Sequence, residues 1–362
     1  MGLRTVVGRV KLKVWQGQDP QDKHWGCPIR EKWALGAHQQ MSPALEEKLA
    51  FTATLAGSYE ATALVAGKWG CPVDDSVIHA LVQRVGSKAE VQSQQRLKQP
   101  PQEKQPQRAG SELAVLMLDG WFARFRGPGW GKKKTKKERV EWHEIKNGVF
   151  YLQEQSGRTE SGRAMISEKT VVRWLGEPME LGRRLHWEAL AGGLARAKEK
   201  LVLADGVGWI WNLKANRWPE ARELLDFWHA AQHLWSLGRV CNRMDEAKAK
   251  PWVEKGLHRL RHGQEPMVLK EISTLKSSRS EAGKIVLKEK NYFAGQARRM
   301  NYKEIADRGW PIGSGPVESS CRQDQCRFKR PGQSWSRRGF ENLSALDQAR
   351  QNNHWDQLWL SA

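Results

Sequence analysis

Two short apolar runs, each ending in Asp-Gly, constrain the fold of this 362-residue chain most strongly. Residues 112–118 precede Asp119-Gly120, and residues 201–204 precede Asp205-Gly206. A short apolar run bounded by a turn signal is consistent with a buried strand. Asp-Gly is also a common turn dipeptide, so a turn explains either occurrence taken alone. Two such strand ends favour a second interpretation, in which two rigidly held carboxylates reach a cleft.

Further strands and helices are expected around these two runs. Residues 140–145 and 149–152 are predicted to be strands, joined by a tight turn at Asn147-Gly148. Other predicted elements are helices at about 164–176 and 185–199, a strand at 223–228 and mainly helical structure over 230–305. Strands mixed with helices in this way predict an α/β core.

The part of the chain before these strands is expected to form a separate region, residues 1–86. Residues 1–20 alternate apolar and polar side chains, which indicates a hairpin. Residues 42–86 contain three helical segments, the first opened by Ser42 as N-cap and Pro43. Two short helices around a glycine-containing turn resemble a DNA-binding helix-turn-helix, and an ordinary helical bundle would give the same pattern.

A polar segment separates this region from the strands. Residues 87–110 are predicted to be a linker, because the run from Gln92 to Arg108 is rich in Gln, Lys and Pro and lacks apolar periodicity. Residues 111–350 then form the predicted α/β domain.

The chain is strongly basic, with 60 Lys and Arg against 40 Asp and Glu and a formal charge of +20. A field of this sign concentrates polyanions, so double-stranded DNA is the first partner expected, with an anionic membrane surface as the competing interpretation. The chain has no apolar run of about 20 residues and no signal peptide at its start. We therefore expect a cytoplasmic, nucleoid-associated protein without a membrane segment.

The cysteines and histidines do not follow a zinc-finger pattern. The five cysteines are odd in number and include no Cys-x2-Cys pair, which favours reduced thiols. His229 and His233 are four positions apart and lie close to Asp226, but zinc would require a third ligand, and none is nearby in sequence. We interpret Asp226 and His229 as structural or substrate-contacting residues.

Glu318 is the candidate for a third carboxylate. It follows the glycine-rich segment 312–316, in which Pro316 suits the first turn of a helix. Its simpler explanation is that an acidic residue near a helix N-terminus interacts favourably with the helix dipole. Carboxylates that converge from separate elements are what two Mg²⁺ ions require in phosphodiester displacement, and Asp119, Asp205 and Glu318 form such a set.

Two basic segments are candidate DNA contacts. The first is a predicted loop with Lys132, Lys133, Lys134, Lys136 and Lys137, for which a solvated surface tip is the simpler explanation. The second follows Glu318 and contains Arg322, Arg327, Lys329, Arg330 and Trp335. Beside a phosphodiester site, these cations would hold a DNA backbone.

Five stretches in order resemble the ISKra group of bacterial insertion-sequence transposases, over most of the chain from about residue 36 onward. They are Met117-Leu118-Asp119-Gly120 with Glu141-Trp142-His143-Glu144 downstream, Ala204-Asp205-Gly206-Val207-Gly208-Trp209-Ile210-Trp211, Leu225-Asp226-Phe227-Trp228-His229-Ala230, Ile312-Gly313-Ser314-Gly315-Pro316-Val317-Glu318-Ser319 and the tail from Arg327 to Ser336.

The resemblance implies a ribonuclease-H-like core that cleaves and joins DNA strands with Mg²⁺ or Mn²⁺, two ions being held by Asp119, Asp205 and Glu318. It also likens Asp226-x-x-His229 to a motif near the active site of related transposases. Asp205 and Glu318 lie 113 positions apart (318 − 205), which resembles transposases with an all-helical insertion, expected here at about 231–308. A homo-oligomer on DNA is expected.

Two alternatives stay open from the sequence. One is a catalytically inactive or truncated DNA-binding relic of a transposase, which would bind DNA without metal-dependent nicking. The other is a general nuclease of the same fold, which would hydrolyse DNA without joining a 3′ end to a target.

Overall fold

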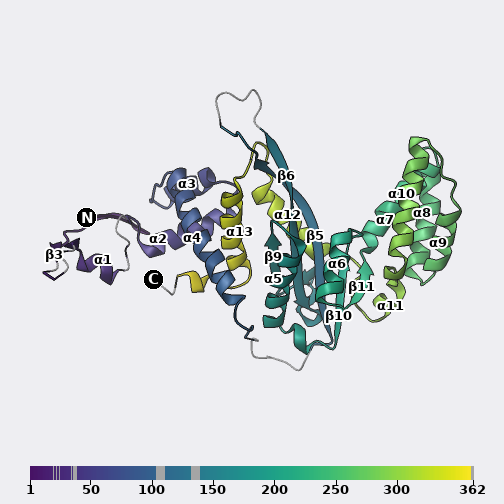
Figure 1. Cartoon of the computed structure of the whole chain (residues 1–362), viewed down its shortest axis with the longest axis horizontal. Helices are drawn as coiled ribbons and strands as arrows, with labels where there is room; N and C mark the ends of the chain where they lie inside the picture. Colours follow the sequence, from purple (N-terminus) through teal and green to yellow (C-terminus); the bar gives the residue numbers. More distant parts are fainter. Residues whose placement is uncertain are drawn as a thin grey trace. The chain divides into compact units, whose positions relative to one another are not determined.

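The computed structural model describes residues 1–18, 20–21, 23, 25–33, 35, 39–102, 111–131 and 139–359 (Figure 1). The protein has an α/β fold. Two compact units are formed by residues distant in sequence. Unit 1 comprises Met1–Gln99, Phe122–His143 and Arg322–Ala362, and unit 2 comprises Pro100–Trp121 and Glu144–Cys321.

A mixed five-stranded sheet is the centre of unit 2. Its strand order is β11-β10-β5-β6-β9. The strands are β5 (Leu113–Arg126), β6 (Val140–Leu152), β9 (Thr170–Trp174), β10 (Glu199–Ala204) and β11 (Arg222–Leu225). β10 pairs in parallel with both β5 and β11, whereas β6 and β9 are antiparallel. Strands and helices are mixed as expected for an α/β core, but the strands predicted at 140–145 and 149–152 are a single strand, β6. Two small strands, β7 (Ser156–Arg158) and β8 (Ala164–Ile166), lie between β6 and β9.

The apolar runs that predicted buried strands are buried. Every residue of 113–118 and 201–204 is fully covered. Leu116 and Leu118 pack with Leu181 and Leu185 of α5 (Pro178–Ala191) and with α6 (Gly208–Arg217) in one apolar cluster. This rigid core fixes the ends of β5 and β10.

The strand β5 does not end at Asp119, as the sequence suggested. It continues to Arg126, with Trp121, Ala123 and Phe125 buried and Phe122 exposed. This alternation of two is the pattern of a half-buried strand, and it carries the chain through Asp119-Gly120 without a turn. Asp119 is therefore held on both sides by strand backbone.

The predicted tight turn at Asn147-Gly148 is wrong, because both residues lie inside β6. Asn147 is fully buried and its side chain accepts a hydrogen bond of 3.2 Å from the Trp121 indole. A Cβ at residue 148 would lie 2.5 Å from Leu185, so glycine is needed here for the approach of α5. The contacts of Asn147 with Trp121 and of Gly148 with Leu185 therefore outweigh the local preference of Asn-Gly for a turn.

Three other predicted boundaries differ from the structure. Residues 164–176 contain β8 and β9 and not a helix, because Val171 and Val172 are buried in the sheet. The helix expected at 185–199 begins at Pro178 and ends at Ala191, followed by the short 3-10 helix η2 (Leu194–Arg196). The strand expected at 223–228 ends at Leu225, because Asp226 caps the next helix.

A group of helices follows β11 in unit 2, which confirms mainly helical structure over 230–305 (Figure 1, green). It consists of α7 (Phe227–Cys241), α8 (Glu246–Arg261), α9 (Glu265–Thr274), α10 (Glu281–Gln296), η3 (Ala297–Arg299) and α11 (Tyr302–Asp307). The chain then enters α12 (Gly315–Phe328), within which the division between the units falls.

Helices α2, α3, α4 and α13 form most of unit 1. The helices α2 (Pro43–Leu55), α3 (Tyr59–Lys68) and α4 (Asp75–Arg96) confirm the three predicted segments, including the Ser42 cap. α4 packs against α13 (Arg337–Gln351), and the predicted N-terminal hairpin is formed by β1 (Gly2–Thr5) and β2 (Gly8–Lys11). The other elements of the unit are β3 (Gly17–Gln18), β4 (Trp25–Gly26), α1 (Pro28–Lys32) and η4 (Asp356–Leu358).

The predicted linker begins too early. Residues 87–96 belong to α4, where Ala89 on one face is buried, so the polar composition there marks an exposed helix face. The division between Gln99 and Pro100 lies within the predicted segment, and residues 103–110 of that segment lie outside the described residues. Within the described part of the chain, no helix combines the length and apolar character needed to span a bilayer.

Candidate functional site

Three aspartates stand in one row across the three parallel strands of unit 2. Leu118 of β5 pairs with Ala204 of β10, and Ala204 pairs with Leu225 of β11. The next residue in each strand direction is Asp119, Asp205 or Asp226. Because neighbouring strands are about 4.8 Å apart, these residues stand side by side at one edge of the sheet.

Asp119 is half-buried and held by two hydrogen bonds. The Gly120 N–H donates to its carboxylate over 2.7 Å, and the Cys321 thiol is also hydrogen-bonded to it. Burial raises the pKa of Asp119, and it does so more strongly than these two hydrogen bonds lower it. The charge of Glu318 raises that pKa further, so Asp119 and Glu318 are electrostatically linked.

Asp205 lies directly after β10, at the start of a short loop before α6. The Val207 N–H donates to its carboxylate over 3.1 Å. Burial raises the pKa of Asp205, and the negative charges of Asp119 and Glu144 add to the increase. Carboxylates that oppose one another's ionisation in this way concentrate negative charge, which a cation would neutralise.

Asp226 is fully buried and caps α7. Its carboxylate accepts a 2.7 Å hydrogen bond from the backbone N–H of His229 and another from the backbone N–H of Ser314. The imidazole Nδ1 of His229 lies 3.2 Å from the same carboxylate. Burial alone would raise the pKa of Asp226, but the hydrogen bonds from His229 and Ser314 lower it. The Asp226 carboxylate, which accepts a hydrogen bond from the imidazole, raises the pKa of His229.

Glu318 reaches this group from the first turn of α12. The segment before it is fixed to the start of α7, because the Phe227 N–H donates to the Ile312 carbonyl over 3.0 Å. Ser314 Oγ then donates to the Glu318 carboxylate over 2.8 Å. Ligand atoms of Asp226, His229 and Glu318 all lie within 4.8 Å of one another.

The third ligand that was not apparent nearby in sequence is therefore Glu318, contributed by α12. His233 does not join this set, because its Nδ1 bonds Glu289 of α10. The set of carboxylate oxygens and one imidazole suits a divalent cation. Among the described residues, Asp226, His229 and Glu318 have ligand atoms close enough to share one cation, whereas Asp119 and Asp205 are outside that group and interact with His229 through charge.

Two nearby residues were not predicted as site residues. Glu144 of β6 lies against Gly120, where a Cβ would approach its Oε1 to 2.6 Å, and it accepts a 3.2 Å hydrogen bond from the Trp209 indole. Cys321 lies one turn beyond Glu318 on α12, and helical spacing (i, i+3) was the sequence signal that could have indicated it. The position of Glu144 depends on the pairing of β6 beside β5, which no local pattern specifies.

The predicted DNA contacts divide into three groups. Lys132, Lys133, Lys134, Lys136 and Lys137 lie outside the described residues. Arg322, Lys329 and Arg330 are exposed. Arg327 and Trp335 are buried in unit 1, which corrects their prediction as surface contacts.

The burial of Arg327 and Trp335 has identifiable causes. Arg327 donates to the carbonyls of Ala53 and Gly57, and its guanidinium lies 5.3 Å from the Tyr59 ring centroid. The Trp335 indole donates to the Phe328 carbonyl over 2.8 Å, and its ring packs with aromatic neighbours. A ring enclosed in this way is not available to stack on a base.

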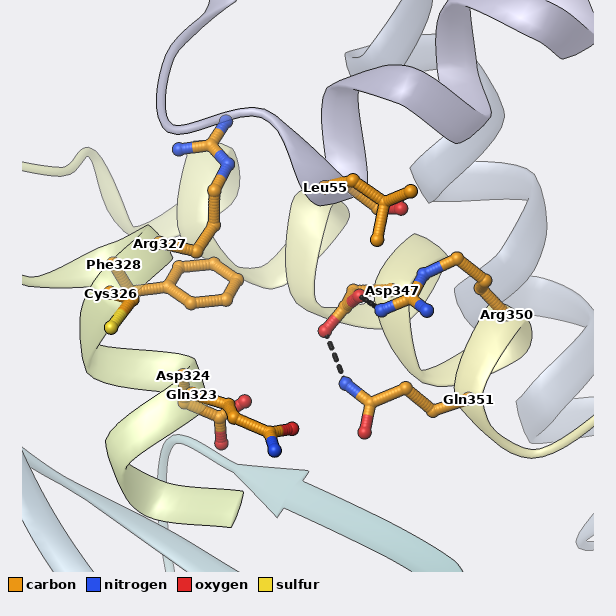
Figure 2. Close-up of a pocket in the computed structure, with 10 residues that line it drawn as sticks. Leu55, Gln323, Asp324, Cys326, Arg327, Phe328, Asp347, Arg350 and Gln351 are labelled. Carbon is orange, nitrogen blue, oxygen red and sulfur yellow. Dashed lines mark hydrogen bonds and ion pairs between the residues drawn. The ribbon is translucent and has the colours of Figure 1, made fainter. Parts of the chain in front are cut away.

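Arg327 also lines a cavity of about 190 Å³ within unit 1. Figure 2 shows this cavity between the end of α12 and α13, where Asp347 bonds both Arg350 (2.7 Å) and Gln351 (2.6 Å). These hydrogen bonds join three α13 residues of the cavity wall to one another, so their side chains are fixed within the fold.

The five cysteines all lie in the described part of the chain, and none of them forms a disulfide. This agrees with the prediction of reduced thiols. A scan of protein-family models found no match to the chain, and a search of curated proteins found no similar protein.

Proposed function

We propose that this protein is a DNA transposase with a ribonuclease-H-like catalytic core, in which Asp119, Asp205 and Glu318 hold the catalytic metal ions. The observation that carries the proposal is that Asp119 of β5 and Asp205 after β10 stand side by side at one edge of the sheet, with Glu318 on the first turn of α12. Charge coupling connects Asp119 with both Asp205 and Glu318. Convergence of carboxylates from separate elements is what metal-assisted phosphodiester chemistry requires.

The arrangement of the elements supports this proposal. β5, β6 and β9 are followed by α5, β10, α6 and β11, and the helices α7 to α11 precede the helix that carries Glu318. This agrees with the ribonuclease-H-like mixed sheet and the helical insertion that the resemblance to ISKra transposases implies. The insertion would comprise α7 to α11, close to the expected 231–308.

The donor atoms present fit Mg²⁺ or Mn²⁺, because hard divalent cations take oxygen ligands. Asp119, Asp205 and Glu318 would be the catalytic ligands in this proposal, and Asp226 and His229, which form a potential cation site with Glu318, would be accessory groups. The metal ions, when bound, would stabilise the charge that develops on the attacking and leaving oxygens. The protein's own contribution is to hold these carboxylates rigidly, through the Gly120, Val207 and Ser314 hydrogen bonds.

DNA is the proposed substrate and partner. The charge of +20 favours a polyanion, and Arg322, Lys329 and Arg330 are exposed cations that follow Glu318 in the chain. A homo-oligomer on DNA and association with the nucleoid belong to the same proposal.

The direct test is metal-dependent cleavage of DNA that contains the ends of the element. Asp119→Ala, Asp205→Ala and Glu318→Ala should each reduce cleavage to background while leaving DNA binding intact, because each removes a metal ligand and no DNA contact. Glu160→Ala, which removes an exposed carboxylate of unit 2, is the matched control and should retain activity. Cleavage retained by any of the three variants would contradict the assignment.

A strand-transfer assay with pre-cut ends tests the joining step. A transposase joins the 3′ ends to target DNA, whereas a general nuclease only hydrolyses DNA. Salt-sensitive binding without metal-dependent nicking would instead identify a DNA-binding relic.

A further inference from the structure

The helix α10 grips the loop that carries Asp205 at two points. The ring of Tyr292 packs so closely on Gly206 that a Cβ at that residue would overlap the ring. The side-chain amide of Gln296 donates to the Gly206 carbonyl over 3.0 Å. Tyr292 and Gln296 are four residues apart and therefore share one face of α10. The backbone next to Asp205 is thus fixed by two residues that follow Gly206 by 86 and 90 positions in sequence (292 − 206 and 296 − 206).

The Tyr292 ring is also held by a residue of α7, His233. His233 stacks on it with ring centroids 3.6 Å apart and an angle of 19° between the planes. His233 Nδ1 also forms a hydrogen bond with the buried carboxylate of Glu289, one turn before Tyr292 on α10. The ring therefore has little freedom to move away from Gly206.

The orientation of the Gln296 amide is also determined by a neighbour. Arg299 donates to Gln296 Oε1 over 2.8 Å, so the NH2 group of the amide is the end that faces Gly206. Arg299 is in turn bonded to Glu223 of β11 over 2.7 Å. Gln296 is consequently tied both to the sheet and to the loop after β10.

The Tyr292 hydroxyl has no such partner. It is buried and makes no hydrogen bond to any residue that the structure describes. Burial, together with the charges of Asp205 and Asp226, raises the pKa of Tyr292, so the hydroxyl stays protonated. The contact with Gly206 is a matter of ring packing, and a phenylalanine would preserve it.

We propose that Tyr292 and Gln296 are positioning residues that hold the loop from Asp205 to Val207 in its metal-binding conformation. This rests on the proposed function for the identity of the ligand at Asp205. The helices α7 to α10 then contribute to the site, because their packing sets the position of the Asp205 carboxylate.

The loop itself supplies the first measurement. The Val207 N–H bonds the Asp205 carboxylate, so its hydrogen-exchange rate reports on the conformation directly. Tyr292→Ala and Gln296→Ala should increase that rate about fivefold or more, since each removes a contact of about 1 kcal/mol or more. Lys288→Ala, an exposed position on the same helix, is the control and should leave the rate unchanged.

Metal binding supplies the second measurement, by titration of the full chain with Mg²⁺ or Mn²⁺ alone. Tyr292→Ala and Gln296→Ala should weaken metal binding by about tenfold or more, as expected for residues that orient a ligand. Tyr292→Phe should bind metal like the unmodified protein, because the ring is kept. Saturating metal should restore cleavage by the alanine variants, which a general loss of structure would not permit.

A double-mutant cycle isolates the contact between Tyr292 and Gly206. Gly206→Ala should be disruptive in the unmodified protein, because its Cβ would overlap the ring. The same change should be much milder in Tyr292→Ala, where the space is vacant, giving a non-additive pair.

The outcomes separate this proposal from the proposed function. An unchanged hydrogen-exchange rate at Val207 in both alanine variants, or additive effects in the double-mutant cycle, would contradict the proposal that Tyr292 and Gln296 hold the loop. This conclusion would not depend on the protein's function. Faster exchange with undiminished metal affinity would also contradict the proposal. Absence of metal binding and cleavage in the unmodified protein would contradict the proposed function, and the exchange rates and the cycle would still decide whether α10 holds the loop.

Discussion

At the scale of single residues, burial decides which charged side chains are available for function. Arg327 and Lys329 are two positions apart in a basic segment, and composition does not distinguish them. The structure buries Arg327 under Ala53 and Gly57 and leaves Lys329 exposed. The role of a cation in such a segment therefore depends on which helix face it occupies.

We predict that Arg327→Ala lowers the free energy of unfolding by roughly 2–4 kcal/mol, because it removes a packed side chain and its hydrogen bonds to buried carbonyls. Urea unfolding monitored by tryptophan fluorescence measures this change. Lys329→Ala is the control, with an expected effect within about 0.5 kcal/mol. Equal free energies of unfolding for the two variants would show that Arg327 does not stabilise the fold.

The acidic residues show the same dependence on surroundings. Asp119, Asp205 and Asp226 share one row, yet burial dominates the pKa of the first two, whereas hydrogen bonds dominate that of Asp226. The pKa of Asp226 is lowered because His229 and Ser314 both donate to it. Equivalent positions in a sheet are therefore chemically different.

At the scale of elements, close helix contacts depend on small residues at the crossing points. α4 and α13 pack tightly in unit 1, and a Cβ at Gly86 of α4 would overlap the Asn342 backbone of α13. Gly67 of α3 is helical too, but a Cβ there would meet open space. The two glycines thus differ in their tertiary surroundings and not in their local conformation.

We predict opposite effects for alanine at these two positions. Gly86→Ala should destabilise the protein by about 1–3 kcal/mol through overpacking. Gly67→Ala should be neutral or stabilise it by about 0.5–1 kcal/mol, because alanine favours a helix. Thermal or urea unfolding of both variants tests this, and a stable Gly86→Ala variant would be incompatible with the packing described.

Glu223 connects β11 to two other elements and gives a pH-dependent prediction. Burial alone would raise the pKa of Glu223, but the hydrogen bond and charge of Arg299 and the charge of Lys214 lower it below its ordinary 4.5. A carboxyl whose pKa is lowered in the folded state stabilises the fold above about pH 4.5, and that contribution is lost as the pH falls through the folded-state pKa.

Glu223→Gln should therefore cost about 1–3 kcal/mol of unfolding free energy at pH 7 and progressively less as the pH falls below about 4.5. Urea unfolding across this pH range is the measurement. Glu281→Gln, at an exposed helical pair with Lys284, should change stability by less than about 0.5 kcal/mol. A difference for Glu223→Gln that does not shrink in acid would contradict the ion-pair explanation.

At the scale of the whole molecule, the charge of +20 governs how the protein meets a polyanion. The logarithm of DNA affinity should fall linearly with the logarithm of salt concentration. Combined replacement of Arg322, Lys329 and Arg330 by alanine should make that slope shallower by roughly 2–3, since each phosphate contact contributes about 0.9.

A second triple variant keeps the net charge equal and moves the change elsewhere. Lys248, Lys250 and Lys255 are exposed on α8, and their replacement by alanine removes the same three charges. Filter binding or fluorescence anisotropy at several salt concentrations compares the two. Equal changes in slope would indicate that total charge, and not the segment after Glu318, sets the affinity.

The sequence alone determined the local features of this protein. Apolar runs predicted the buried strands β5 and β10, Ser42 and Pro43 predicted the start of α2, and residues 230–305 were predicted to be mainly helical, as α7 to α11 are. It also identified Asp119, Asp205 and Glu318 as candidates. These features depend on side-chain periodicity and on groups that satisfy nearby backbone, so neighbours in sequence are sufficient to specify them.

Only the tertiary structure decided which residues meet. Asn147-Gly148 became strand because a distant Trp121 and Leu185 occupy its surroundings, and Arg327 became structural because α12 and α2 pack together. The grouping of Glu318 with Asp226 and His229, and the grip of α10 on Gly206, likewise join segments far apart in the chain. The free energy of burial and of long-range hydrogen bonds outweighs local preferences of about 1 kcal/mol, and those long-range partners are not encoded in any local pattern.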